Sequence, residues 1–190
     1  MELDLAIFIG VCHVVGFAIL GYGLWSARKS TRAAAWPSVS ATITKLEVRE
    51  ISDSESTTYE VKVEYAYTVA GTAYAGSRVA FGYAGSSGRK AHDEIHRKLR
   101  EAKGVSVRYD PSAPSVSCLS YGMHRSIQFA LAFAVAWLLF WSGFTLLWLS
   151  SNIAAGVVIV MFVLFVSGFT LLAWLFSRSD SVLLNNLSVQ

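Results

Sequence analysis

The stretch YEVKVEYAYTV at residues 59–69 decides the fold of the middle of this chain. Its apolar positions alternate with polar or small ones. A period of two places the apolar set on one face of a β-strand, so we expect a half-buried strand with Tyr65 and Tyr67 in the core. The pair Gly71-Thr72 follows it and predicts a tight turn into a second strand over residues 73–81.

The segments on either side of this hairpin predict the rest of a small β domain. Before it, a strand is expected over residues 39–48, where the apolar phase slips between Ile43 and Leu46 and indicates a bulge. After it, we expect a helix capped by Ser86 or Ser87, and then two short strands over 105–109 and 116–119. This order of elements is that of an OB-type barrel, and a five-strand open roll is equally compatible.

Three long apolar segments flank the β domain. A bilayer core is crossed by about 20 helical residues, and each segment is long enough. The sequence therefore predicts an α+β membrane protein with three transmembrane helices and the β domain inserted between the first and second. The expected boundaries are transmembrane helices at 5–27, 127–149 and 153–176, a soluble β-rich domain at 34–122, and a polar tail at 177–190.

The composition agrees with a membrane protein and excludes several other classes. Apolar residues make up 54% of the 190 residues and charged residues 15%, against about 25% charged in average soluble domains. Such a chain is too apolar to be intrinsically disordered. Two cysteines do not make a disulfide scaffold. A net charge of +3 is too small to argue for a nucleic-acid partner.

The distribution of charge predicts an orientation. Arg28, Lys29 and Arg32 follow the first apolar segment, and Arg125 precedes the second. Lys and Arg gather on the cytoplasmic side of membrane proteins, so we expect the β domain and the C-terminus in the cytoplasm and the N-terminus outside. The N-terminal residues are acidic rather than basic, which favours an uncleaved anchor over a signal peptide.

Three stretches carry a resemblance to a known family. They are WPSVSATI at residues 36–43, the strand at 59–69 with Gly71 and Tyr74 after it, and GVSVRYDP at 104–111 with Pro114. In this order they resemble a bacterial membrane protein family catalogued only as a domain of unknown function. The resemblance covers roughly residues 30–122. It implies a β domain anchored in the bacterial inner membrane, and it implies no activity and no catalytic residues.

The segment His92-Asp93-Glu94-Ile95-His96 is the strongest candidate for chemistry. Two histidines four residues apart share a helix face and suit a zinc ion, although a zincin has Glu directly after the first His. A third ligand is not evident in the sequence. The alternative interpretation is a solvated helix face, and because it is favoured we predict no catalytic residue, no metal and no cofactor.

Four cations follow on the same predicted helix, namely Arg97, Lys98, Arg100 and Lys103. They are candidate contacts for anionic lipid or for a partner protein. Ordinary solvation of a charged helix face is the equally weighted alternative.

A short repeat occurs in the second and third apolar segments. Ser142-Gly143-Phe-Thr-Leu-Leu recurs as Ser167-Gly168-Phe-Thr-Leu-Leu. Small residues let membrane helices approach closely, so the repeat predicts that these two helices pack together.

These observations favour a non-enzymatic membrane protein. We expect its β domain to bind a protein partner, such as a membrane or co-encoded protein, or the membrane surface, in an accessory, adapter or immunity-like role. An exposed edge strand of the domain is one way to accept a partner. The alternatives are a subunit of a homo-oligomeric channel or transporter and, more remotely, a metal-dependent enzyme that uses His92 and His96.

Overall fold

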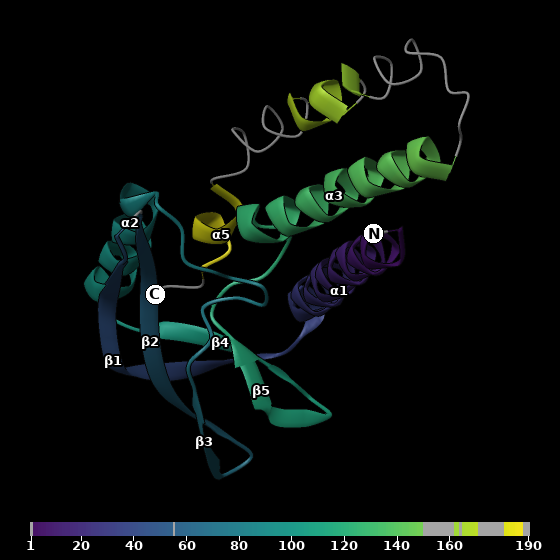
Figure 1. Cartoon of the computed structure of the whole chain (residues 1–190). Helices are drawn as coiled ribbons and strands as arrows, with labels where there is room; N and C mark the ends of the chain where they lie inside the picture. The colour runs from purple at the N-terminus through teal and green to yellow at the C-terminus, as the bar shows by residue number, and fades with distance from the viewer. Residues whose placement is uncertain (1, 55, 150–161, 164, 171–180, 188–190) are drawn as a thin grey trace. The chain divides into compact units, whose positions relative to one another are not determined.

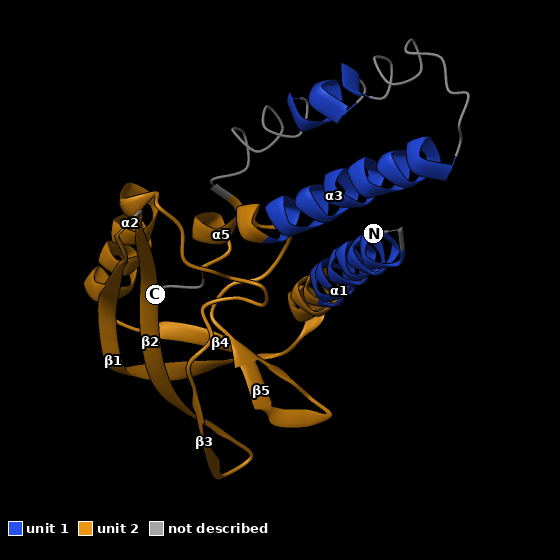
Figure 2. Cartoon of the chain, in the orientation of Figure 1, with its two compact units in different colours: residues 1–25, 127–179 blue, residues 26–126, 180–190 orange. Residues whose placement is uncertain are grey.

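The chain folds as an α+β protein (Figure 1). The computed structural model describes residues 2–54, 56–149, 162–163, 165–170 and 181–187. It contains two compact units (Figure 2). We call residues 1–25 with 127–179 the helical unit, and residues 26–126 with 180–190 the β unit.

The β unit contains one five-stranded sheet in the order β3-β2-β1-β4-β5, in which every neighbouring pair is antiparallel. Its strands are β1 (Ser38–Ser52), β2 (Thr57–Val69), β3 (Thr72–Gly76), β4 (Val105–Asp110) and β5 (Ala113–Cys118). Helix α2 (Arg89–Glu101) lies between β3 and β4 in the chain. The predicted element order is confirmed. In the described residues no ladder joins β3 to β5, so the structure shows an open sheet, in agreement with the open-roll alternative, and the OB-like barrel is not confirmed.

The predicted bulge in β1 is confirmed. Ile43 pairs with Tyr65 and Lys45 pairs with Glu64, so Thr44 is the extra residue. An extra residue reverses the alternation of faces beyond it. Ile43 and Leu46, three residues apart, therefore both pack against the core of the β unit.

The β2–β3 hairpin differs from the prediction in two details. Positive φ angles at Ala70 (48°) and Gly71 (83°) place the turn one residue earlier than predicted, with the two positive values that a type I′ turn requires. Strand β3 ends at Gly76 and does not reach residue 81. Beyond it the chain leaves the ladder, and the Val79 carbonyl accepts hydrogen bonds from the backbone of Leu119 and Ser120 instead.

Tyrosines of β2 connect strands that are not neighbours in the sheet. The Tyr65 hydroxyl lies 3.1 Å from Ser117 Oγ of β5, and the Tyr67 hydroxyl donates to the Pro114 carbonyl at 2.5 Å. Both tyrosines are at most 3% exposed, which confirms their predicted place in the core. Burial raises the pKa of Tyr65 to about 12, so its hydroxyl stays neutral. The sheet therefore curls until its ends share one core.

The C-terminal segment belongs to the β unit. Helix α5 (Ser181–Asn185) and the two residues after it lie in the stretch predicted as a polar tail. Leu183 and Leu187 instead enter the core, at 8% and 3% exposure. The Leu183 carbonyl accepts a hydrogen bond from Ser120, and Asn186 donates to the Tyr121 carbonyl. The segment from 182 to 187 is thus a packed part of the domain.

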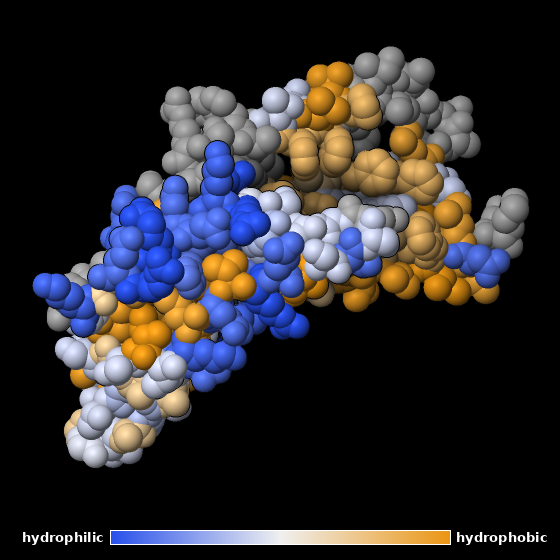
Figure 3. Space-filling model, turned by 90° about the vertical axis from the view of Figure 1, so that its left-hand side faces the viewer, coloured by the Kyte–Doolittle hydropathy of each residue, from blue (hydrophilic) through white to orange (hydrophobic). Residues whose placement is uncertain are grey.

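The helical unit contains two described helices that are long and apolar enough to cross a membrane. Helix α1 (Glu2–Arg32) overlaps the candidate span Leu3–Ala35, and α3 (Arg125–Leu149) is the second candidate span. Their 18-residue windows have mean hydropathies of 2.3 and 2.0. Large apolar side chains stand exposed along both, among them Phe8, Phe17, Leu139 and Leu146. Hydrophobic and hydrophilic residues gather in separate areas of the surface (Figure 3). The third predicted span, 153–176, lies largely outside the described residues. The described residues within it, 162–163 and 165–170, are helical.

Candidate functional site

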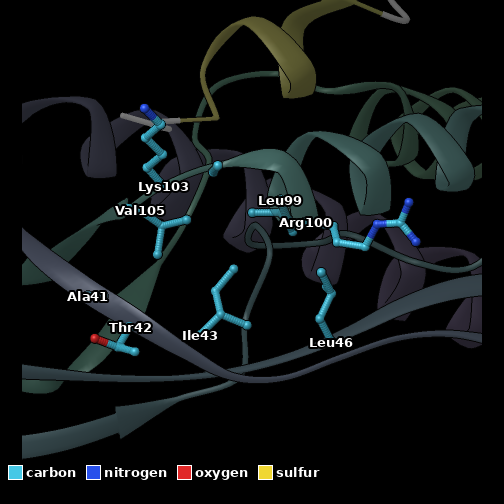
Figure 4. Close-up of a pocket in the computed structure, with 10 residues that line it drawn as sticks. Ala41, Thr42, Ile43, Leu46, Leu99, Arg100, Lys103 and Val105 are labelled. Carbon is cyan, nitrogen blue, oxygen red and sulfur yellow. The ribbon is translucent and has the colours of Figure 1, made fainter.

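A pocket of about 370 Å³ opens where β1 and β4 separate (Figure 4). The last pair that joins the two strands is Ala41 with Val105. Beyond this pair β1 continues, whereas the chain preceding β4 turns away into α2. The pocket is lined by Ala41, Thr42, Ile43, Leu46, Leu99, Arg100, Ala102, Lys103, Gly104 and Val105. Its place in the fold is therefore the fork between two strands and the end of a helix.

The inner wall of the pocket is apolar because of the bulge in β1. Ile43 and Leu46 face Leu99 of α2, as Figure 4 shows. In a regular strand two side chains three residues apart point to opposite faces, and the bulge at Thr44 brings Ile43 and Leu46 to the same face. The sequence alone did not predict this pocket. The phase slip between Ile43 and Leu46 was the one signal in the sequence that pointed to it.

Two cations lie at the rim of the pocket. Arg100 and Lys103 are exposed and stand on either side of Leu99 in Figure 4. Among the described residues, the structure records no ion pair and no hydrogen bond for either side chain. The other two predicted contact residues are engaged: Arg97 pairs with Glu101 at 3.2 Å, and Lys98 donates to the Leu184 carbonyl. Of the four predicted cations, the pair at the pocket is the one for which the described residues show no partner.

One edge of β1 is open next to the pocket. On one side β1 pairs with β2 along residues 41–52. On the other side it pairs with β4 only along residues 38–41, and no ladder covers the remainder of that edge in the part of the chain that the structure describes. An open edge presents backbone donors and acceptors to another extended chain. The pocket, the two cations and this edge form the candidate site.

His92, the first residue of the predicted metal pair, is buried rather than solvated. Its exposure is 3%, so the interpretation of this position as part of a solvated helix face is wrong. Nδ1 lies 2.7 Å from the Tyr83 hydroxyl and Nε2 lies 2.9 Å from Ser86 Oγ. A metal ion at either nitrogen would have to displace one of these partners. No group of three potential metal ligands occurs in the described residues.

The hydrogen bonds of Tyr83 indicate the tautomer of His92. The Tyr83 hydroxyl accepts a hydrogen bond from the Val61 amide, so it is free to donate to Nδ1 of His92. Nε2 then carries the proton and donates to Ser86 Oγ. Ser86 thus holds His92 and does not cap α2, which begins after Gly88 with no side-chain cap. This network ties the loop before α2 to the sheet.

Lowering the pH from 7 to 5 is expected to destabilise the β unit. Burial lowers the pKa of His92, against an opposing effect of Glu60 and Asp93, and burial also lowers the pKa of His124. As the pH falls, the unfolded chain binds protons that the folded chain excludes. Each histidine then removes at most about 1.4 kcal/mol of stability per pH unit. Thermal unfolding at several pH values measures this slope, which His92→Gln should flatten. If stability depended on pH as steeply in His92→Gln as in the parent protein, the pKa of His92 would not be lowered by folding.

Two glycines of α1 mark its packing against α3 in the helical unit. A Cβ built on Gly16 would lie 2.6 Å from the Leu138 side chain, and one on Gly23 would lie 2.8 Å from Leu131, so α1 and α3 approach closely at both glycines. Ser142 lies 3.4 Å from Nε2 of His13 on α1. A Cβ on Gly168 would meet nothing within 4 Å. The predicted packing of the second and third helices through their Ser-Gly pairs stays a prediction, because most of the third segment lies outside the described residues. Among the residues that are described, the rings of Phe140 and Phe165 lie 5.8 Å apart.

Comparison with known proteins gives one result. The model of the family described as "Domain of unknown function (DUF3592)" matches residues 39–124. The predicted resemblance is confirmed over this range. No curated protein and no solved structure matches the chain. The matched range holds α2, the candidate site and all of the sheet except Ser38.

Proposed function

We propose that this chain, which carries the domain of unknown function at residues 39–124, is a non-enzymatic protein of the bacterial inner membrane whose β unit binds a protein partner. The open edge of β1 beside an apolar pocket is the observation that carries this proposal. Partner proteins add strands to such edges. The exposed apolar surface of α1 and α3 supports the membrane location.

The packing of the C-terminal segment supports a third membrane crossing. Helix α3 begins at Arg125, directly after the β domain, and its 25 residues extend about 37 Å at 1.5 Å per residue. If α3 crosses the bilayer, residue 149 is on the opposite side from the domain. Residues 182–187 are again packed in the β unit. The chain then returns through the bilayer between these points, as the predicted span at 153–176 provides.

Labelling of introduced cysteines tests this topology. Ser54→Cys lies in the exposed β1–β2 connection and Asn185→Cys lies on the exposed side of α5, both in the β unit. Cys12 and Cys118 are replaced by serine or alanine beforehand. We expect an impermeant maleimide to label neither position in intact cells and both after permeabilisation. Labelling of both in intact cells would place the domain outside. Labelling of only one position would contradict the prediction that both lie on the same side of the membrane.

Purification of the complex tests the function. The full chain is extracted gently from its native membranes, and the mass and composition of the complex are determined. We expect a stoichiometric foreign protein. A large complex of this chain alone would support the channel alternative instead. A monomer without partners would contradict both. Stoichiometric zinc in the purified protein would support the enzyme alternative built on His92 and His96.

A further inference from the structure

We propose that the candidate site binds the C-terminal end of an extended peptide whose last residue is apolar. In this arrangement the terminal side chain enters the pocket, the terminal carboxylate meets Arg100 and Lys103, and the preceding residues pair with the open edge of β1. The inference rests on the proposed function, because it specifies which part of a partner protein the β unit recognises.

The size and lining of the pocket suit an apolar side chain. Its volume of about 370 Å³ lies near the lower end of the range for ligand pockets, about 300–1,000 Å³. Ile43, Leu46 and Leu99 give it an apolar wall. All three side chains belong to or border the core of the β unit, so the wall is held in place by packing. Burial of one apolar side chain against this wall would provide selectivity for the last residue.

The two rim cations suit a carboxylate at the end of that chain. Arg100 is in the last turn of α2 and Lys103 is two residues beyond its end at Glu101, and both line the pocket. Arginine binds a carboxylate through two parallel hydrogen bonds. The described residues place no acidic partner on either cation, so no internal ion pair has to be broken first. The neighbouring acid, Glu101, is already paired with Arg97.

The open edge sets the direction of the bound peptide. The pocket lies at the residue 42–46 end of this edge, and the edge continues to Ser52. If the C-terminal residue of the peptide lies in the pocket, the residues before it extend along the edge toward Ser52. Its direction is opposite to that of β1, which gives an antiparallel pair and continues the line of β4. Side chains alternate between the two faces of such a strand, so the last residue and every second residue before it face the side on which the pocket lies.

A peptide titration tests the proposal with the full chain in nanodiscs. The probe is a fluorescent peptide of sequence TEVTVL with a free carboxylate, compared with its C-terminal amide and with TEVTVD. We expect the free acid to bind, and both comparison peptides to bind at least about tenfold more weakly. The amide loses a charge-assisted hydrogen bond, and TEVTVD loses the burial of an apolar side chain. Two further peptides carry N-methyl groups on alternate residues, one on the odd-numbered and the other on the even-numbered positions. Only one of these two sets of N–H groups points toward β1 in a paired strand, so one peptide should bind more weakly and the other should not.

Protein variants locate the site. Arg100→Gln with Lys103→Gln removes the rim cations and should weaken binding of the free acid by about tenfold or more. Arg89→Gln with Lys90→Gln is the matched control, since it removes equal charge from the start of the same helix, outside the pocket, and leaves the Arg97–Glu101 pair intact. We expect the control to bind within about twofold of the parent, because surface charges away from a contact contribute little. Both pairs are exposed, so all variants should keep the fold.

Four results would overturn the inference. The first is equal binding of acid and amide, the second is equal weakening in the two double variants, and the third is no peptide binding at millimolar concentration. The fourth is binding of dodecyl phosphate at the pocket in place of peptide, which would identify a lipid site. The proposed function is judged separately. If a stoichiometric partner is retained by Arg100→Gln with Lys103→Gln, the partner function stands and only this inference fails.

Discussion

Replacing Gly76 with alanine is expected to destabilise the β unit by about 1–3 kcal/mol, the usual cost of forcing an extra methyl group into a packed core. A Cβ at this position would overlap the Tyr65 ring, 2.6 Å from Cζ, and would lie 2.7 Å from Ser117 Oγ. The ring has no room to move, because Tyr65 is 1% exposed and its hydroxyl is held by Ser117 and by the Arg78 carbonyl. The effect should be large for so small a change.

Hydrogen exchange of the β unit, followed by mass spectrometry, measures this loss in the full chain. Faster exchange is expected in peptides from β2 and β5, which meet at the Tyr65 ring. Gly88→Ala is the matched control, because the nearest atom to its built Cβ is Ser86 Oγ at 3.5 Å, an ordinary contact. If Gly76→Ala exchanged no faster than Gly88→Ala, the close approach of Gly76 to the ring would be incorrect.

Replacing Leu99 with alanine should have the larger effect of the two. Leu99 is 2% exposed and lies in the core cluster of the β unit, where it connects α2 to the sheet. A buried leucine replaced by alanine typically costs about 2–5 kcal/mol, from lost burial and from the cavity left behind. The cavity would also join the neighbouring pocket, of which Leu99 forms a wall. We therefore expect both lower stability and weaker peptide binding.

Thermal unfolding and peptide titration together test the Leu99 variant. The comparison is Arg100→Ala, one residue further along α2 and exposed, which should leave stability within about 0.5 kcal/mol, as surface changes usually do. That variant should still weaken peptide binding, because it removes one of the rim cations. If both variants had equal stability, α2 would not be packed on the sheet as the structure has it.

Much of the fold follows from short-range pattern. The alternation at residues 59–69 predicted β2 and its buried tyrosines, because a period of two can bury only one face of a strand. The phase slip near Thr44 predicted the bulge for the same reason. Two apolar segments without charged residues predicted α1 and α3, because each is long enough to cross a bilayer as a helix. In the structure, large apolar side chains such as Phe8 and Leu139 are exposed along them.

The candidate site depended on contacts that no local pattern reports. The cations Arg97, Lys98, Arg100 and Lys103 appeared equivalent in the sequence because each sits on the same polar face. Their difference arises from partners, since Glu101 holds one and the distant Leu184 carbonyl holds another. His92 was likewise expected in solvent. It is buried because residues 83 and 86, in the loop before α2, fold back over its ring.

The sequence by itself determined the apolar helices, the strands and their order, since each depends on the periodicity of neighbouring residues. Only the tertiary structure decided where segments distant in the chain meet. In the sequence, Leu183 and Leu187 look like part of a polar tail, but both pack in the core of the β unit. The hydroxyl of Ser120, 63 residues earlier in the chain than Leu183, donates a hydrogen bond to the Leu183 carbonyl. The pocket exists for the same reason. It requires the bulge in β1, the end of α2 and the start of β4 to come together, and that proximity is a property of the packed fold rather than of any one segment.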